Sequence, residues 1–514
     1  MPVVAFDHNK TTAKDRYDAL EGEKKAYQDR AEKCAKYTIP MAFPKATSTY
    51  STEYDTPYQS IGARGVNNLA SKLLTALVPP NAPFFRLGLG SDVMKQMQQN
   101  PDVLMQWEQA LSQYENNIVQ YMESTLQLRT TASEAFIQLL IAGNCLLFLP
   151  PAEGGIKMYR LKDYCVLRDG IGNIVEIVAV DHIAAAALPP EAQSLIKDDV
   201  EPSKKIDVYT HVYLEGENFL SYQEIDGQQI GSSNQSYPVN KSPWMALRLR
   251  KMDGESYGRS FVDEYIGDLS SLELLSKAIV EASGIAANIL YMVNPNSTTK
   301  ISELSKAKSG DFIKGKMEDV QILQMNKAAD LQIAQMEKQQ LSSDLSYAFL
   351  LNSAVQRNAE RVTAEEIRYV AQELEGTIVS IYSILSQEFQ LPLVRRCLVQ
   401  MERLGLIPEL PQGAKGIEPV VTTGIEALGR GADLQNLDTF IRYAQIFPEA
   451  FNTAVKANQI LSQICTALRI NPAKVIKTDA EVQQEQAMAA QQQAAASGME
   501  TAANAAGQQM GQQQ

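Results

Sequence analysis

The sequence has few residues of the kinds that build most catalytic and metal sites. It contains only three histidines, His8, His182 and His211, and none lies within metal-ligand spacing of another histidine or a cysteine. The five cysteines are far apart and odd in number, which is typical of reduced thiols made in a cytosol and not of a disulfide framework. No nucleophile elbow, paired carboxylates or serine–histidine–aspartate grouping stands out. We therefore expect no enzymatic activity, no cofactor and no metal, and we interpret His182 and His211 as satisfied residues of a sheet.

Long apolar runs are also absent. The longest, residues 139–150, is interrupted by Asn144 and is shorter than the about 20 residues that a membrane-spanning helix needs. It indicates a buried helix or strand pair. The start of the chain reads MPVVAFDHNK and has no basic region ahead of an apolar core, so no secretory signal and no contact with a membrane are expected.

Basic residues are outnumbered by acidic ones. The chain has 60 aspartates and glutamates against 47 lysines and arginines, which gives a net charge of −13. Tight binding of DNA depends on lysine and arginine that displace phosphate counterions, so the chain as a whole is expected to repel nucleic acid. Any contact with DNA is therefore predicted to be local, weak or non-adhesive.

The residues that are present predict an α+β fold that is mainly helical. Helical spacing of apolar residues and proline breaks indicate four early helices, over about 10–36, 62–77, 102–127 and 132–142. Between about 156 and 249, apolar and polar residues alternate, and Gly-Asn, Glu-Gly and Asp-Gly pairs separate the runs. This pattern is typical of antiparallel strands joined by hairpin turns.

A long helix is predicted over 261–292, because apolar residues recur there every three or four positions. Its other side is acidic. The acidic residues on this side are Asp263, Glu264, Asp268, Glu273 and Glu281. Such a charge run is usually a solvated face, and that interpretation stays open on the residues alone.

The second half of the chain is also mainly helical. A β-like stretch over about 308–325 is followed by a helix over 330–351 and a polar loop over 352–362. The next helix, 363–404, starts at a capping box of Thr363 and Glu366, and a bend is predicted at Pro392. Residues 405–478 are again helical with breaks, and residues 479–514 form a tail rich in glutamine and alanine for which disorder is expected.

One stretch, GDFIKGKM from Gly310, nearly matches the phosphate-binding loop of nucleotide-binding proteins. That loop needs a hydroxyl after its lysine to hold magnesium and a helix that starts at the phosphates. Here Met317 replaces the hydroxyl and the strand-like VQILQM follows. We therefore interpret the stretch as a hairpin turn.

Several longer stretches occur in an order that points to a known family. They read GARGVNNLASKLLTALVPP, IDVYTHVYL, DGESYGRSFVDEYIGDLSSLE, LNSAVQRNAERVTAEEIRYVAQELEGTIVSIYSILSQEFQLPLV and GIEALGRGADL. Up to about residue 478 the chain closely resembles the portal proteins, or head-to-tail connectors, of short-tailed T7-like bacteriophages. This resemblance implies the viral portal fold, a ring of usually twelve subunits with an axial channel for double-stranded DNA at one capsid vertex.

The resemblance also implies a division of the chain. Residues 1–260 would form most of the wing, with a long wing helix over 363–404. The two stem helices would span 261–292 and 330–351, the clip 293–329, the tunnel loop 352–362 and the crown 405–478. No role is carried over to the 479–514 tail.

The same resemblance suggests where DNA passes. The tunnel loop would bring Gln356, Arg357, Asn358 and Arg361 of every subunit towards the axis, where they can contact phosphates without regard to sequence. The five acidic residues of 261–292 would line the channel and deter adhesion.

The implied partners are further copies of this chain, double-stranded DNA, the terminase large subunit, the scaffolding protein, the major capsid protein, the tail adaptor and internal core proteins. The expected location is the portal vertex of the virion, after assembly in the host cytoplasm.

Two other functions remain open from the residues alone. One is a ring-forming tail adaptor, or another structural virion protein that does not itself conduct packaging. The length and the helix–hairpin–helix plan of the stem argue against it. The other is a packaging ATPase or nuclease, for which the chain has neither a nucleotide motif nor clustered carboxylates that could hold a metal.

Overall fold

A computed structural model describes residues 11–44, 52–80, 83–88, 101–151, 154–196, 200–287, 290–296, 300–314, 316–323, 328–351, 381–406, 420–423, 442–443 and 461. The chain divides into two compact units. The first comprises 1–86, 115–409 and 420–424, and the second 87–114, 410–419 and 425–514. Of the second unit the structure describes mainly the first part of helix α4 (Pro101–Ser124). The description below concerns the first unit.

Three helices form one side of the core. They are α1 (Ala13–Lys36), α2 (Ile61–Leu77) and α5 (Leu128–Ala142), close to the predicted ranges. A capping box starts α1, since the Thr12 hydroxyl accepts the Asp15 N–H and the Asp15 carboxylate accepts the Thr12 N–H. Helix α5 packs against both α1 and α2 through a nearly continuous buried surface that includes Phe136 and Leu139.

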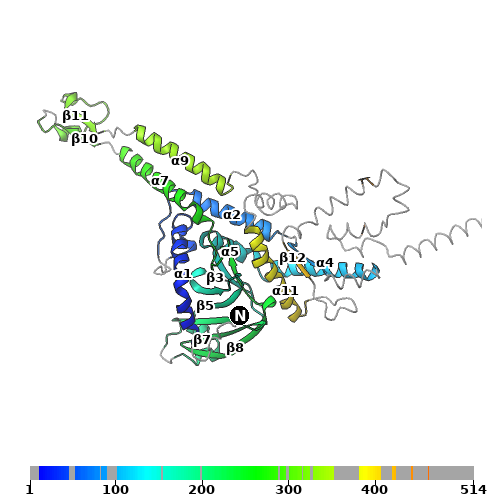
Figure 1. Cartoon of the computed structure of the whole chain (residues 1–514). Coiled ribbons are helices and arrows are strands. Elements are labelled where there is room, and N and C mark those ends of the chain that lie inside the picture. Colours follow the sequence, from blue (N-terminus) through cyan, green and yellow to red (C-terminus); the bar gives the residue numbers. More distant parts are fainter. Residues whose placement is uncertain are drawn as a thin grey trace, which may run out of the picture. The chain divides into compact units, whose positions relative to one another are not determined.

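The strands predicted between about 156 and 249, together with β2 from the 139–150 run, form two antiparallel sheets (Figure 1). The larger has the order β4 (Tyr164–Arg168), β5 (Ile174–Ala184), β6 (Lys205–Glu215), β7 (Asn218–Ile225) and β8 (Gln228–Pro238). The smaller has the order β3 (Lys157–Arg160), β2 (Asn144–Phe148) and β9 (Trp244–Arg248). Helix α1 lies against strands β4 to β7 of the larger sheet. This mixture of helix and sheet confirms the α+β class.

Hairpin turns occur where the glycine pairs predicted them. Asp226 and Gly227 join β7 to β8, and both have positive φ angles, 48° and 79°, as a type I′ turn requires. The run 139–150 is neither one helix nor a strand pair. It contains the end of α5, then Gly143 at φ 77°, then β2.

The described residues also form short elements. These are β1 (Phe85–Gly88), α6 (Pro190–Gln193), α8 (Ile301–Leu304) and β12 (Val420–Thr423), with one-turn helices η1 (Pro40–Ala42), η2 (Leu161–Asp163), η3 (Ala185–Ala187), η4 (Val239–Lys241), η5 (Val262–Tyr265) and η6 (Met317–Asp319). No helix among the described residues is long and apolar enough to span a membrane.

Two helices run side by side away from the sheets, and a small β pair follows at their far end (Figure 1). The helices are α7 (Ile266–Ala287) and α9 (Ala328–Ala348), and the strands β10 (Leu290–Val293) and β11 (Val320–Leu323) pair antiparallel. The helix predicted over 261–292 was therefore too long, because residues 290–293 belong to a strand. Tyr291 and Val293 favour a strand once β11 is there to pair with them.

Of the predicted 363–404 helix, the structure describes 381–404. It contains a π-helical turn, η7 (Ser386–Gln390), followed by α11 (Leu391–Arg403). Proline at 392 has no N–H to donate, and its ring crowds the carbonyl four residues earlier, so a wider turn there relieves the clash. The irregularity thus falls immediately before the predicted position.

Candidate functional site

The candidate site is the α7–α9 pair together with the β10–β11 segment that follows it. On α9, half-buried or buried residues recur every three or four positions at Leu331, Ala334, Lys338, Leu341 and Leu345, and this row faces α7. On α7 the buried residues are Leu269, Leu272 and Ser276. The two helices therefore share a narrow, mainly apolar seam that also includes Lys338 and Ser276.

The end of α9 is held by α2. The Asn68 side chain donates to the carbonyls of Phe349 and Leu350, each at 3.0 Å, which satisfies two carbonyls at the end of the helix. Gly65 allows this approach, because a Cβ there would lie 2.4 Å from Cγ of Phe349. Both residues belong to the stretch GARGVNNLASKLL, so part of that motif serves to fix α9.

The five acidic residues predicted on 261–292 have different surroundings. Glu273 accepts the backbone N–H groups of Tyr58 and Gln59 at 3.0 and 3.1 Å and so fixes the approach to α2. Glu264 forms an ion pair with Arg250.

The other three are less engaged. Asp263 is half-buried, Asp268 is exposed, and Glu281 lies 3.9 Å from Lys277 one turn away. Whether these residues line a channel stays a prediction, but Glu264 and Glu273 have structural partners within the chain.

Sequence reasoning missed a second acidic row, on α9. Asp330, Glu337 and Asp344 are exposed and follow one another at intervals of seven residues, which places them on one side of the helix. Gln340 donates to both carboxylate oxygens of Asp344, at 3.0 and 3.1 Å. The seven-residue interval was the signal that could have identified this row.

Both helices also expose large apolar side chains. On α9 these are Ile333, Met336 and Tyr347, with 62%, 71% and 78% of their surface exposed, and they fall between the positions that face α7. On α7, Leu274 and Ile285 are 69% and 56% exposed and lie eleven residues, or about three turns, apart on one side. Each helix therefore carries its own uncovered apolar row.

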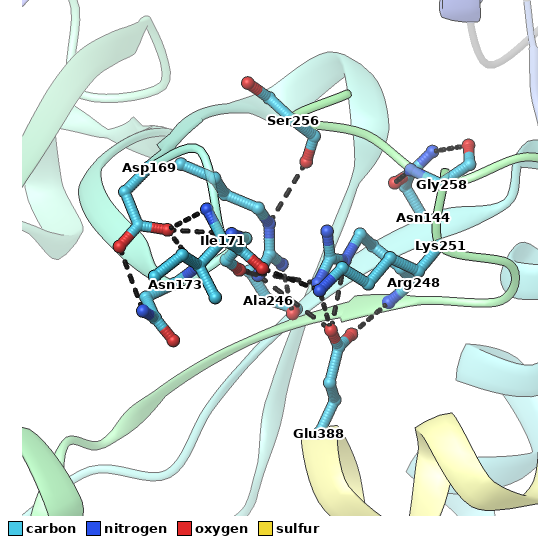
Figure 2. Close-up of polar contacts among 12 residues, drawn as sticks. Asn144, Asp169, Ile171, Asn173, Ala246, Arg248, Lys251, Ser256, Gly258 and Glu388 are labelled. Atoms are coloured by element: carbon cyan, nitrogen blue, oxygen red, sulfur yellow. Dashed lines mark hydrogen bonds and ion pairs between the residues drawn. The ribbon is translucent and has the colours of Figure 1, made fainter. Parts of the chain in front are cut away.

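The 381–404 helix is fixed to the smaller sheet by a buried charge cluster (Figure 2). Glu388, in the π-helical turn, accepts the Arg248 backbone N–H at 2.9 Å and the Arg248 Nε at 3.0 Å, and lies 3.9 Å from an Arg168 nitrogen. Burial lowers the pKa of Arg168 to about 10, and the charge of Glu388 opposes this effect. The cluster joins residues that are 140 and 220 positions apart, so no local pattern could predict it.

Beside this cluster, Asn144 joins β2 to the 256–260 loop. Its amide accepts the Gly258 N–H at 2.6 Å and donates to the Gly258 carbonyl at 2.8 Å. The polar residue that interrupted the 139–150 run is thus fully satisfied.

The two described histidines lie in the sheet, as predicted. His211 is buried on β6, 2.7 Å from Glu176 and 3.0 Å from the Tyr222 hydroxyl. Exposed His182 on β5 lies 2.7 Å from its cross-strand neighbour Asp207. Among the described residues no group of three or more histidines, cysteines or carboxylates could hold a metal ion.

The predicted tunnel-loop residues Gln356, Arg357, Asn358 and Arg361 lie outside the described residues, as do the 363–380 segment, most of the predicted crown and the tail. The GDFIKGKM stretch is followed by η6 and strand β11, not by a long helix. It therefore lacks the helix N-terminus that a phosphate-binding loop needs.

Comparison with known proteins decides the family. The family described as "Bacteriophage head to tail connecting protein" matches residues 10–476. The chain belongs to this family. The portal protein of Enterobacteria phage T3 is 45% identical over 97% of this chain and 94% of its own length, and that of Escherichia phage T7 is 43% identical over 92% and 90%. The predicted resemblance, and with it the function of a phage portal protein, is confirmed.

More distant similarities are weaker. The portal protein of Enterobacteria phage SP6 is 28% identical over 92% of this chain and 91% of its own length. Among solved structures, the neck of an empty GTA particle has a chain that is 11% identical, with a TM-score of 0.35, covering 80% of this chain and 90% of that chain.

Proposed function

We propose that this head-to-tail connecting protein forms a closed ring at one capsid vertex and that double-stranded DNA is packaged and ejected through the ring. Its relation to the T3 and T7 portal proteins over nearly the whole chain is the observation that carries the proposal. In this scheme α7 and α9 are the stem, β10, β11 and the segment between them are the clip, and the two sheets with α1, α2 and α5 are the wing.

The uncovered apolar rows of α7 and α9 support a ring. Fully burying an aliphatic side chain of this size contributes about 1.5 to 3 kcal/mol, so two apolar rows left in water are unfavourable for a single copy. We assign the α7 row, Leu274 and Ile285, to the contact with the α9 row of a neighbouring copy, Ile333, Met336 and Tyr347. An interface between two different surfaces repeats from copy to copy and closes into a ring when the rotation allows it.

The acidic rows support a channel to which DNA does not adhere. Asp330, Glu337 and Asp344 on α9, with Asp268 and Glu281 on α7, would present carboxylates to passing phosphates and repel them. The opposite contribution belongs to the tunnel loop, 352–362, where Arg357 and Arg361, with Gln356 and Asn358, would contact phosphates in a sequence-independent way. The net charge of −13 suits such a channel.

The remaining roles follow from the same scheme. The ring, of about twelve copies, would nucleate head assembly with the scaffolding and major capsid proteins, and would contact internal core proteins. The terminase large subunit would dock during packaging and supply ATP hydrolysis, so this chain would be structural and not an enzyme. The tail adaptor would later bind the clip. The protein would assemble in the host cytoplasm and remain at the portal vertex of the virion.

Negative-stain images of the purified chain test this proposal. We expect rings with a central hole, and a monomer under assembly conditions would contradict it. Replacing Arg357 and Arg361 with alanine should leave the rings intact but reduce the DNA packaged or retained per head. Unchanged DNA content in heads that carry this double variant would count against the tunnel-loop assignment.

A further inference from the structure

The segment between β10 and β11 exposes an aromatic side chain. Phe312 is completely exposed, and Ile313 and Ile301 are 38% and 65% exposed. An isolated chain gains nothing from leaving a phenylalanine in water, and exposed aromatic residues are enriched where proteins bind other proteins. These residues are therefore a candidate contact surface.

Hydrogen bonds define the turn immediately before Phe312. The Asp311 N–H donates to the Lys308 carbonyl at 3.0 Å, and the Asp311 carboxylate accepts the Lys308 N–H at 2.7 Å. Gly310 has a φ of 102°, a conformation that side chains with a Cβ rarely adopt. The backbone immediately before Phe312 is thus fixed in a turn, which lowers the backbone part of the entropy cost of binding.

The stretch of sequence that contains Phe312 is basic, unlike the chain as a whole. Residues 306–316 contain four lysines and one acidic residue, Asp311, which gives this stretch a net charge of +3 (4 − 1) in a chain of net charge −13. The exposed lysines are Lys306, Lys308, Lys314 and Lys316. The Asp311 carboxylate is already engaged in the turn.

An apolar anchor framed by lysines fits a protein better than it fits DNA. Lysines alone would suit a phosphate backbone, but a duplex offers no place for a phenylalanine unless base pairs unstack, which costs a few kcal/mol. A protein surface with an apolar pocket and carboxylates around it satisfies both features at once.

We propose that Phe312 is the anchor by which the clip binds an acidic protein surface containing an apolar pocket. The inference rests on the proposed function, under which the clip end of the ring receives the tail adaptor. Phe312 fills the pocket and sets the lifetime of the complex, and the four lysines set its charge preference and its dependence on salt.

The test uses assembled rings of the full chain and the purified tail adaptor of the same phage. We expect Phe312→Ala rings to form normally and to bind the adaptor at least tenfold more weakly than wild-type rings. Ile171→Ala removes a comparably exposed apolar side chain, 76% exposed, from a turn of the wing, and should leave binding unchanged. The double variant Lys314→Glu, Lys316→Glu should also bind more weakly, and its affinity should depend less on salt.

Wild-type rings that do not bind the adaptor would overturn both this inference and the proposed binding of the adaptor at the clip. Other results would overturn the inference alone. One is Phe312→Ala rings that bind the adaptor as well as wild-type rings do. Another is failure of Phe312→Ala alone to form rings, which would place this side chain between subunits. A lysine variant that loses binding to a 30-base-pair duplex but keeps the adaptor would assign the surface to DNA. Absence of rings in the wild type would contradict the proposed function itself.

Discussion

Replacing Glu388 with glutamine should weaken the attachment of the 381–404 helix to the smaller sheet. The carboxylate is 19% exposed, and the side chains of Arg168 and Arg248 are 4% and 3% exposed, so the substitution leaves two buried guanidinium groups without a counter-charge. Removing one partner of a buried ion pair costs about 3 to 5 kcal/mol. We take about 3 kcal/mol, because glutamine can still accept one hydrogen bond.

Hydrogen exchange measures this effect where it arises. The Arg248 N–H donates to Glu388, so its protection reports the contact directly. A loss of about 3 kcal/mol corresponds to about 150-fold faster exchange, provided that opening is in rapid equilibrium. Peptides covering β9 and residues 386–395 should show this faster exchange together.

A matched control removes the same charge from an exposed ion pair. Glu134 lies 3.7 Å from Arg160, but these side chains are 53% and 33% exposed, so Glu134→Gln should change stability by less than about 1 kcal/mol. If Glu388→Gln exchanged no faster than Glu134→Gln at Arg248 and in 386–395, the cluster would not hold the helix and our reasoning would be refuted.

Three further changes test other parts of the fold. Burial raises the pKa of Glu176, but hydrogen bonds from Arg16 and His211 outweigh burial and lower the pKa from 4.5 to about 2. The ionised carboxylate therefore contributes about 3 kcal/mol to the free energy of unfolding above pH ~4.5, and this contribution is lost as the pH falls towards 2. Urea unfolding of Glu176→Gln at a series of pH values should lack this part of the acid sensitivity. Glu273→Ala should speed hydrogen exchange of the Tyr58 and Gln59 amides at least tenfold, whereas the control Glu281→Ala should not. Equal exchange rates in the two variants would show that Glu273 does not hold these amides. Gly65→Ala should lower the melting temperature, because the added Cβ would lie 2.4 Å from Cγ of Phe349. An unchanged melting temperature would mean that the α2–α9 contact can move apart at no cost in stability.

Local patterns in the sequence predicted most of the described elements. Apolar spacing located α1, α2, α4, α5 and α9 within a few residues, and the Asp226–Gly227 pair marked its hairpin because a type I′ turn needs positive φ at both positions. The end of α7 was misplaced, because the apolar residues 289–293 continue a helical pattern and only pairing with β11 makes them a strand.

The contacts that fix the candidate site could not be predicted in the same way. Glu273 binds the backbone just before α2, more than 200 residues earlier in the sequence. Glu388 binds Arg168 and Arg248, which are 220 and 140 positions away. Gly65 reads as an ordinary residue near a helix start, and its role depends on Phe349, which only the fold brings to it. Long-range contacts of this kind leave no periodic trace in a single sequence.

The central claim is that copies of this chain associate through two different surfaces, the α7 row and the α9 row. Leu274→Arg blocks the first and Met336→Arg blocks the second, so each variant alone should remain a monomer of 56.7 kDa. An equimolar mixture retains one intact α7 row and one intact α9 row, and a single contact can form between them. Mass photometry of the mixture should therefore show a two-chain particle of 113.4 kDa (2 × 56.7) and nothing larger, while the wild type forms rings. Rings from either variant alone, or a mixture that stays monomeric, would contradict the account.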